Sequence, residues 1–196
     1  MPRGAVSPAR FFLPPGPNLL FAAQIPMIVP DMIEVTAPAI TKYPRPRGNL
    51  NFTKAVLLVM AGQVFKCRGD GDLKALAGRL EAPGFPVATV GRDFRYLKGR
   101  IPYKDDPRGI EWIASARRTV LYGEGGDCDD LSVASATVLM MQGIPCFFRA
   151  IAYRVPEFTH VYTVARVGKR EIPFDLTLDR VGQERIFKRN IDLELQ

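Results

Sequence analysis

The chain has 196 residues, a length that suits one domain with an appendage or two small domains. Hydrophobic residues make up 47% of the chain and charged residues 24%, which is enough apolar surface for a packed core. No apolar run approaches the roughly 18–20 residues that span a bilayer, and prolines interrupt the apolar start. We therefore expect no transmembrane segment, no signal peptide and no membrane partner, and a cytoplasmic location.

The charge and the cysteines narrow the choice of partner and compartment. The net charge is +7, and residues 1–99 carry all of it, with 13 Lys/Arg against six Asp/Glu. No basic run is long and no nucleic-acid motif is present, so we favour a solvated basic surface over nucleic-acid binding. The three cysteines have no paired spacing, which favours reduced thiols in a reducing compartment.

Residues 1–50 contain ten of the 17 prolines, which exclude long helices and central strands there. This segment is nevertheless richer in apolar residues than a disordered tail. We therefore predict an extended, proline-rich arm over residues 1–50, lying against its own domain or a partner. The domain itself is predicted to span residues 51–196, with its motif-bearing core at about 90–180.

Several elements are predicted before the main motif. Capping and apolar spacing predict helices over residues 51–65 and 73–80, and residues 94–103 have an extended pattern. Asp106-Pro107 has the residues of a helix start, because Asp suits the N-cap and Pro suits the first turn. We expect that helix to continue to just before Gly123.

The clearest helix follows the sequence Gly125-Gly126-Asp127-Cys128-Asp129-Asp130. Asp127 has the character of an N-cap, and Asp130 stands three residues later, as in a capping box. Apolar residues follow at helical spacing until Gly143, which suits the end of a helix. Cys128 therefore lies in the first turn, where the helix dipole favours a thiolate and the neighbouring carboxylates oppose it.

Strands are predicted after this helix, over residues 146–155, 158–167 and 171–175, which gives an α+β pattern. A turn at Gly168-Lys169 places His160 and Asp175 on adjacent antiparallel strands, within about two residues of opposite each other. Diagonal cross-strand neighbours lie about 7–8 Å apart, close enough for Asp175 to accept a hydrogen bond from the imidazole. The other ring nitrogen would then face Cys128, as in a thiol nucleophile with an oriented base.

The stretch from about Tyr103 to Asp179 resembles the transglutaminase-like superfamily of cysteine-triad enzymes, which has a papain-like fold. It covers a little over a third of the chain. The residues that carry the resemblance are Asp106-Pro107, Glu111, Gly126-Asp127-Cys128-Asp129-Asp130, Gly143-Ile144-Pro145-Cys146, Arg149, His160-Val161 and Phe174-Asp175-Leu176-Thr177.

The resemblance implies that Cys128 is the nucleophile, His160 the general base and acid, and Asp175 the residue that orients His160. It also implies an α+β core in which the nucleophile helix packs on an antiparallel sheet. An oxyanion would be held by the backbone N–H of Cys128 and a second donor, for which Tyr103 and Trp112 are candidates. We interpret Trp112 as a core residue and Arg149 as a structural ion-pair partner.

Two functions follow from the resemblance. The first is cysteine-dependent acyl transfer or hydrolysis of an amide in a protein or peptide, and compact microbial versions favour hydrolysis over crosslinking. The second is a structural or assembly protein, since small forms with this motif are similar to proteins encoded among bacteriophage head and tail genes. Residues 1–50 would then dock on other phage proteins in a virion. We expect no cofactor and no metal site, and we interpret the aspartates around Cys128 as framework.

Overall fold

The computed structural model describes residues 9–11, 33–35, 40–44, 50–108 and 110–195. Helices and strands are mixed along the chain, as the α+β prediction requires. The elements are β1 (Ala9–Phe11), β2 (Ile33–Val35), β3 (Ile40–Pro44), α2 (Leu50–Cys67), α3 (Gly71–Leu80), α4 (Pro86–Arg100), β4 (Ile110–Ala114), the π-helical segment η1 (Arg117–Tyr122), α5 (Cys128–Met141), β5 (Cys146–Ala152), β6 (His160–Val167), β7 (Arg170–Phe174) and β8 (Arg189–Leu195).

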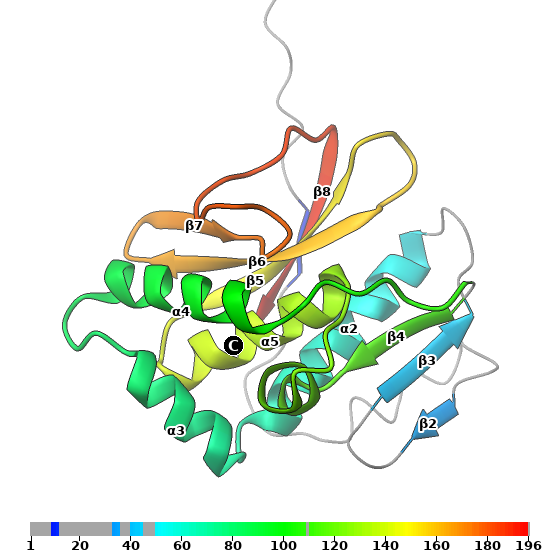
Figure 1. Ribbon diagram of the computed structural model, residues 1–196. Helices are drawn as coiled ribbons and strands as arrows, with labels where there is room; N and C mark the ends of the chain where they lie inside the picture. Colours follow the sequence, from blue (N-terminus) through cyan, green and yellow to red (C-terminus); the bar gives the residue numbers. More distant parts are fainter. Residues whose placement is uncertain (1–8, 12–32, 36–39, 45–49, 109, 196) are drawn as a thin grey trace, which may run out of the picture.

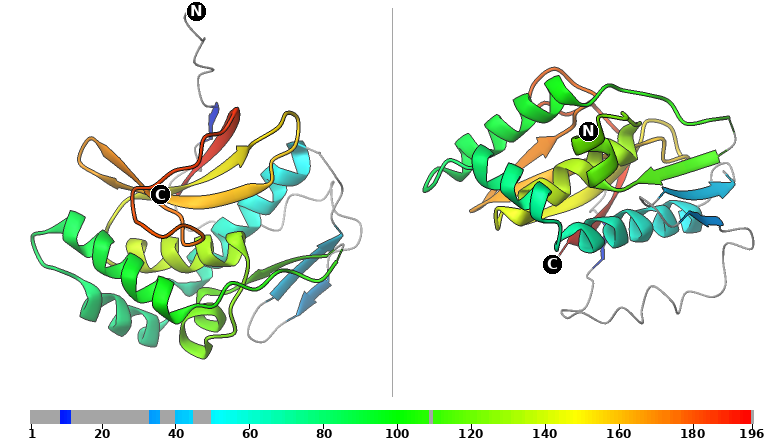
Figure 2. Two further views of the ribbon diagram at one scale, coloured as in Figure 1. Left: turned by 45° about the horizontal axis from the view of Figure 1, so that its top comes forward. Right: turned by 60° about the horizontal axis from the view of Figure 1, so that its bottom comes forward.

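A five-stranded sheet in the order β1-β8-β5-β6-β7 forms one layer, and the helices lie on one side of it (Figure 1). Strands β5, β6, β7 and β8 pair antiparallel, whereas β1 runs parallel to β8. A smaller sheet, β2-β3-β4, lies to one side of α2 and α5 (Figures 1 and 2). The predicted helix packed on an antiparallel sheet is therefore present.

Helix α5 is the centre of the core. Its residues are buried almost without interruption from Asp129 to Leu139, because the sheet covers one side and α2, α3 and α4 cover the others. Small side chains allow the close approach to β6: Ser135 donates a hydrogen bond to the hydroxyl of Thr163 at 2.9 Å. Helix α5 is thus fixed against β6, the strand that begins at His160.

The prediction that residues 94–103 are extended is wrong, because most of them form the second half of α4. Pro86 begins this helix at its first turn, where a missing N–H is tolerated. Val90, Phe94 and Leu97 are buried at a spacing of four and three residues, which is helical. That apolar stripe outweighs the strand-favouring aromatic residues of the same stretch.

The prediction of a helix that begins at Asp106-Pro107 is also wrong. Residues 110–114 form β4, which pairs antiparallel with β3, and only η1 after it is helical. Instead of capping a helix, the Asp106 carboxylate accepts a hydrogen bond from the backbone N–H of Trp112 at 2.6 Å. Pairing with β3, which is distant in sequence, therefore overrides the local helix signal.

By length and composition alone, helix α2 is long and apolar enough to cross a membrane. The sequence analysis did not predict a helix of this kind. The core helix of a globular domain passes the same test, and α2 packs against α5. Its buried residues include Leu57, Met60 and Val64, at helical spacing. The apolar stripe of α2 is thus used in the core of this domain.

Helix α2 begins at Leu50, and a boundary between arm and domain at this point stays a prediction. Within the arm, β1 pairs with β8, and β3 pairs with both β2 and β4, so the described parts of the arm join the sheets of its own chain. The remainder of the predicted arm, including most of its prolines, lies outside the described residues.

Arg149 is a structural ion-pair residue, as predicted. Its guanidinium contacts Asp192 at 2.9 Å, Glu171 at 3.2 Å and Glu184 at 3.1 Å. Asp192 is 1% exposed, so Arg149 neutralises a buried carboxylate. This cluster links Arg149 on β5 to Asp192 on β8, Glu171 on β7 and Glu184 in the loop between β7 and β8, and so supports the sheet.

Asp93 provides a pH-dependent test of the helix packing. It is fully buried on α4, and only one of its oxygens is bonded, by the Gln142 side chain at 3.1 Å. Burial raises the pKa of Asp93 to about 6; the Gln142 bond opposes this and Glu81 adds to it. The folded state therefore holds this proton more tightly than the unfolded chain, so stability is lost as the pH rises from about 4 to about 6.

We expect Asp93→Asn to raise the free energy of unfolding at pH 7 by about 2–3 kcal/mol and to change little at pH 4. Urea denaturation at the two pH values measures this difference. The exposed Asp179→Asn change is the matched control and should be neutral at both. An equal effect of Asp93→Asn at pH 4 and pH 7 would contradict the assignment.

Candidate active site

The start of α5 is built by hydrogen bonds from the motif aspartates. Asp127 is the N-cap and accepts from the backbone N–H of Asp129 at 3.2 Å. Asp130 accepts in return from the backbone N–H of Asp127, which completes the predicted capping box. The same carboxylate accepts from the backbone N–H of Ala114 at 2.6 Å and so ties β4 to the helix start.

The glycines before the motif permit close packing of two chain segments. Gly125 has φ +78°, and a Cβ there would lie 2.6 Å from the carbonyl oxygen of Pro102. Gly126 pairs with the segment around Tyr103 through two backbone hydrogen bonds. The Gly126 N–H donates to the carbonyl oxygen of Pro102 at 3.3 Å, and the Lys104 N–H donates to the carbonyl oxygen of Gly126 at 2.9 Å. Tyr103 is thereby held beside the loop that precedes Cys128.

A Cβ at Gly126 would overlap the carboxyl group of Asp130. We expect Gly126→Ala to lower the free energy of unfolding by about 3 kcal/mol, the upper range for overpacking, because Asp130 is fixed by two backbone N–H groups. Thermal and urea denaturation measure the loss.

Gly62→Ala in α2 is the matched control, since a Cβ there meets nothing within 4 Å and alanine favours a helix interior by roughly 0.5–1 kcal/mol. If the two alanine variants were equally stable, the close approach at Gly126 would be disproved.

The carboxylate oxygens of Asp106, Asp127 and Asp130 lie within 4.8 Å of one another, near enough to hold a cation. Each of them also accepts a backbone hydrogen bond that shapes the loop or β4. Burial raises the pKa of Asp129 and of Asp130 well above the ordinary value, and the neighbouring carboxylates add to the effect. The hydrogen bonds support the framework role expected for Asp127 and Asp130, whereas both carboxyl oxygens of Asp129 are buried without a hydrogen-bond partner.

Cys128 occupies the first turn of α5 and is half-buried, whereas Cys67 and Cys146 are buried; all three are free thiols. Its sulfur receives a hydrogen bond from the backbone N–H of Val161, the residue after His160. Ser132 supports this contact, because its hydroxyl bonds the carbonyl oxygens of both Cys128 and Val161, at 2.6 and 3.2 Å. Helix α5 and strand β6 thus bring Cys128 next to His160 in the chain's fold.

The resting thiol of Cys128 is protonated. Burial raises its pKa far above the usual range, and Asp127, Glu111 and Asp175 raise it further, while the Val161 N–H lowers it. The helix dipole expected to favour a thiolate is therefore outweighed by burial and by carboxylates. Among the described residues, Sγ bonds to the Val161 backbone rather than to the imidazole, so a base must take the proton during attack.

His160 and Asp175 form the contact expected from the hairpin. Thr163 pairs with Phe174, so Asp175 stands two residues from the position opposite His160. Nε2 of His160 lies 2.7 Å from Oδ2 of Asp175. The other oxygen of Asp175 accepts from the N–H and hydroxyl of Thr177, at 3.0 and 2.7 Å, which fixes the carboxylate.

The electrostatics of this pair suit an oriented base. Asp175 is 3% exposed; burial works to raise its pKa, but the His160 and Thr177 bonds hold the pKa below its usual value. The carboxylate is therefore ionised at neutral pH and keeps the Nε2 proton in place, which leaves Nδ1 as the nitrogen for a thiol. Tyr153 stacks on the imidazole, with ring centroids 6.5 Å apart.

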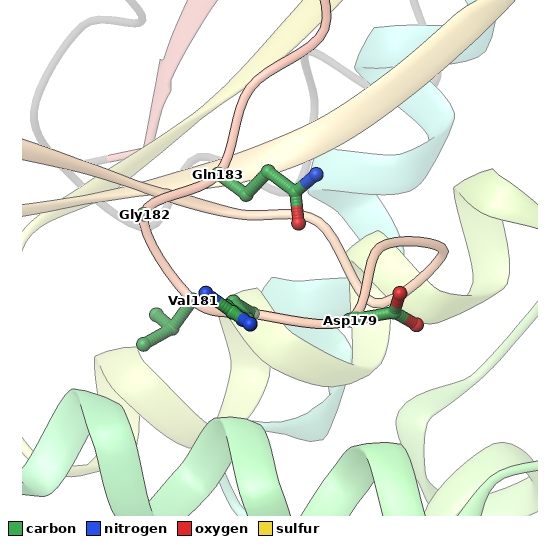
Figure 3. Close-up of a pocket in the computed structure, with 5 residues that line it drawn as sticks. Asp179, Val181, Gly182 and Gln183 are labelled. Carbon is green, nitrogen blue, oxygen red and sulfur yellow. The ribbon is translucent and has the colours of Figure 1, made fainter.

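A hollow of about 400 Å³ opens beside His160. Tyr103 and Tyr153 form aromatic walls, and the other lining residues are Lys98, Thr159, Leu176, Thr177 and Arg185. A second hollow, of about 480 Å³, is lined entirely by residues 179–183 of the loop between β7 and β8 (Figure 3). Its lining contains neither a cysteine nor a histidine, whereas His160 lines the first hollow.

The fold thus brings His160 and Asp175 into contact and Cys128 beside the strand that carries His160. Of the two candidates for an oxyanion donor, Tyr103 lines the hollow, whereas Trp112 lies half-buried on β4. The sequence analysis did not predict three of the residues that line the hollow, Lys98, Tyr153 and Arg185. Each comes from a different part of the chain, and no motif spacing connects them.

No family model matches the chain, and no curated protein matches it. A crystal structure of a protein described as a candidate cysteine protease, from Cytophaga hutchinsonii, is similar in structure. The match covers 71% of this chain and 49% of the other, at 15% sequence identity and a TM-score of 0.42. This chain therefore spans about half the length of that protein.

Proposed function

We propose that this chain hydrolyses amide bonds in a peptide or protein through a thioester on Cys128. The observation that carries the proposal is the contact of 2.7 Å between half-buried His160 and buried Asp175. His160 begins β6, and the next backbone N–H of that strand, from Val161, bonds the Cys128 sulfur. An oriented imidazole beside a thiol at a helix start is the arrangement that nucleophilic catalysis requires. A charged, aromatic hollow of about 400 Å³ beside the pair offers room for a substrate.

In the first step, Nδ1 of His160 takes the thiol proton as the Cys128 sulfur attacks the amide carbon. The carbonyl oxygen becomes an oxyanion, which the backbone N–H of Cys128 stabilises at the start of α5. We assign the hydroxyl of Tyr103 as the second donor. Burial and the nearby carboxylates of Asp127 and Asp105 raise the pKa of Tyr103 to about 12, and a thiolate at Cys128 would add to this effect. The hydroxyl therefore keeps its proton at neutral pH and, in the free protein, donates it to Asp105.

In the second step, the imidazolium gives its proton to the amide nitrogen, the carbon–nitrogen bond breaks and the amine leaves. A thioester joins the acyl group to Cys128. His160 then removes a proton from water, which attacks the thioester carbon, and the sulfur leaves and regains its proton from His160. Asp175 remains a carboxylate throughout and stabilises the imidazolium in each half-reaction.

A mixed library of fluorogenic peptide amides tests the proposal. We expect the purified chain to release the fluorescent amine, and hydroxylamine to divert the acyl group into a hydroxamate, because it competes with water for the thioester. Mass spectrometry identifies both products. Absence of amine release from every member of a library that varies each side chain would sink the hydrolase proposal.

The alternative, a phage structural or assembly role for residues 1–50, has less support. The strands described in that segment pair with β4 and β8 of the same chain. These contacts favour an arm that completes the domain's own sheets over one that docks elsewhere. Hydrolysis is therefore the function that the described residues support best.

A further inference from the structure

The hollow beside His160 is cationic. Lys98 from α4 and Arg185 from the loop between β7 and β8 both line it, and no aspartate or glutamate does. Both side chains belong to exposed residues. Within the described part of the chain, neither forms an ion pair with a carboxylate, whereas Arg117, Arg149 and Arg166 all do.

Both cations are held in place without being neutralised. The Lys98 ammonium donates to the carbonyl oxygen of Leu176 at 2.7 Å, which leaves two of its N–H groups for another acceptor. Arg185 bonds the hydroxyl of Tyr153, the residue that stacks on His160. A guanidinium has five N–H donors, so most of them remain for a ligand. Two fixed, unneutralised cations at one hollow are suited to a carboxylate.

The residues that line the hollow indicate which side of the scissile amide it faces. Its lining contains His160 and Thr159 and both residues after Asp175, but not Cys128. His160 delivers a proton to the departing nitrogen, so the leaving amine must lie on the histidine side of the site. A group bound in this hollow therefore belongs to the amine side of the substrate.

We propose that Lys98 and Arg185 bind a carboxylate on the leaving-amine side of the scissile amide, which makes the enzyme selective for acidic leaving groups. This inference rests on the proposed hydrolysis. The carboxylate can be an aspartate or glutamate side chain or the terminal carboxylate of a short leaving peptide. Both sources present the same charge and hydrogen-bond acceptors to the two cations.

The test uses internally quenched peptides with one acyl portion and different leaving portions. Glutamate, glutamine or lysine follows the scissile bond, each with a free or an amidated C-terminus. We expect the glutamate peptide to exceed the glutamine peptide in kcat/KM by about 10–100-fold, since a charged hydrogen bond contributes roughly 1.5–3 kcal/mol. A large effect of amidation alone identifies the terminal carboxylate as the source.

Lys98→Met and Arg185→Met should each reduce the ratio of kcat/KM for the glutamate peptide over the glutamine peptide by about tenfold. Lys98→Glu should favour the lysine peptide. Lys169→Met, in the β6–β7 turn, removes the same charge away from the hollow and should preserve the preference.

Equal turnover of the three peptides, or a glutamate preference unchanged in both methionine variants, would overturn the carboxylate site while leaving the hydrolase intact. Failure of the wild-type chain to cleave any peptide would instead count against the hydrolase itself, and the carboxylate site would fall with it.

Discussion

Cys128→Ala should eliminate amide hydrolysis, with kcat/KM reduced by at least about 10⁴-fold and no hydroxamate formed with hydroxylamine. The reason is chemical, because the methyl group of alanine cannot attack a carbonyl carbon or carry an acyl group. Cys128 is half-buried and its hydrogen bond comes from one backbone N–H, so the free energy of unfolding should change by no more than about 2 kcal/mol. Steady-state hydrolysis and urea denaturation separate the two effects.

Cys67→Ala is the matched control for this variant. Cys67 is also a free thiol but is buried at the end of α2, and its removal should lower stability while kcat/KM stays within about twofold. Residual hydrolysis by Cys128→Ala at the wild-type rate would show that another group is the nucleophile.

Asp175→Ala should reduce kcat/KM by about 10²–10⁴-fold, because the imidazole loses the partner that sets its tautomer and stabilises its protonated form. The affected contact is the 2.7 Å bond between Oδ2 and Nε2 of His160. The loss should fall mainly on kcat, since Asp175 acts through His160 and is not placed against the substrate. Asp179→Ala, an exposed aspartate on the same loop, should leave both constants unchanged.

The same variant has a pH signature in stability. The pKa of Asp175 is lower in the folded chain than in the unfolded chain, despite burial, because His160 and Thr177 bond the carboxylate. Its contribution to stability is therefore present at pH 7 and is lost as the pH falls below about 4 and through the lowered pKa. We expect Asp175→Ala to be destabilised at pH 7, with the difference from wild type shrinking toward pH 3. A constant difference across this range would contradict the assignment.

The site was more predictable from the sequence than the rest of the fold. The capping box and Gly143 identified α5, and Gly143 indeed has φ +72°. The turn at Gly168 set the register of the hairpin, from which the contact between His160 and Asp175 followed. These features depend on residues close together in sequence, where spacing alone determines geometry.

Apart from the missed second half of α4, the errors in secondary structure arose where distant pairing decides the structure. Residues 110–114 become β4 because β3 pairs with them, although Asp106-Pro107 resembles a helix start. Strand β8 was not predicted, and it is placed by pairing with β5 and by the ion pair of Asp192 with Arg149. The protonated state of Cys128 could likewise not be predicted from the sequence, because it depends on burial in the folded chain, which raises the pKa of the thiol.

The most direct test of the catalytic claim is the rate at which iodoacetamide alkylates Cys128 at pH 7 in the wild type and in His160→Ala. Cys128 is the most accessible of the three thiols, so only the comparison between the two proteins reports activation. Peptide mass mapping gives the rate at each cysteine, with Cys67 and Cys146 as internal controls. Wild-type Cys128 should react at least about tenfold faster than in the variant, because His160 takes the thiol proton. Equal rates in the two proteins would contradict a thiol activated by His160.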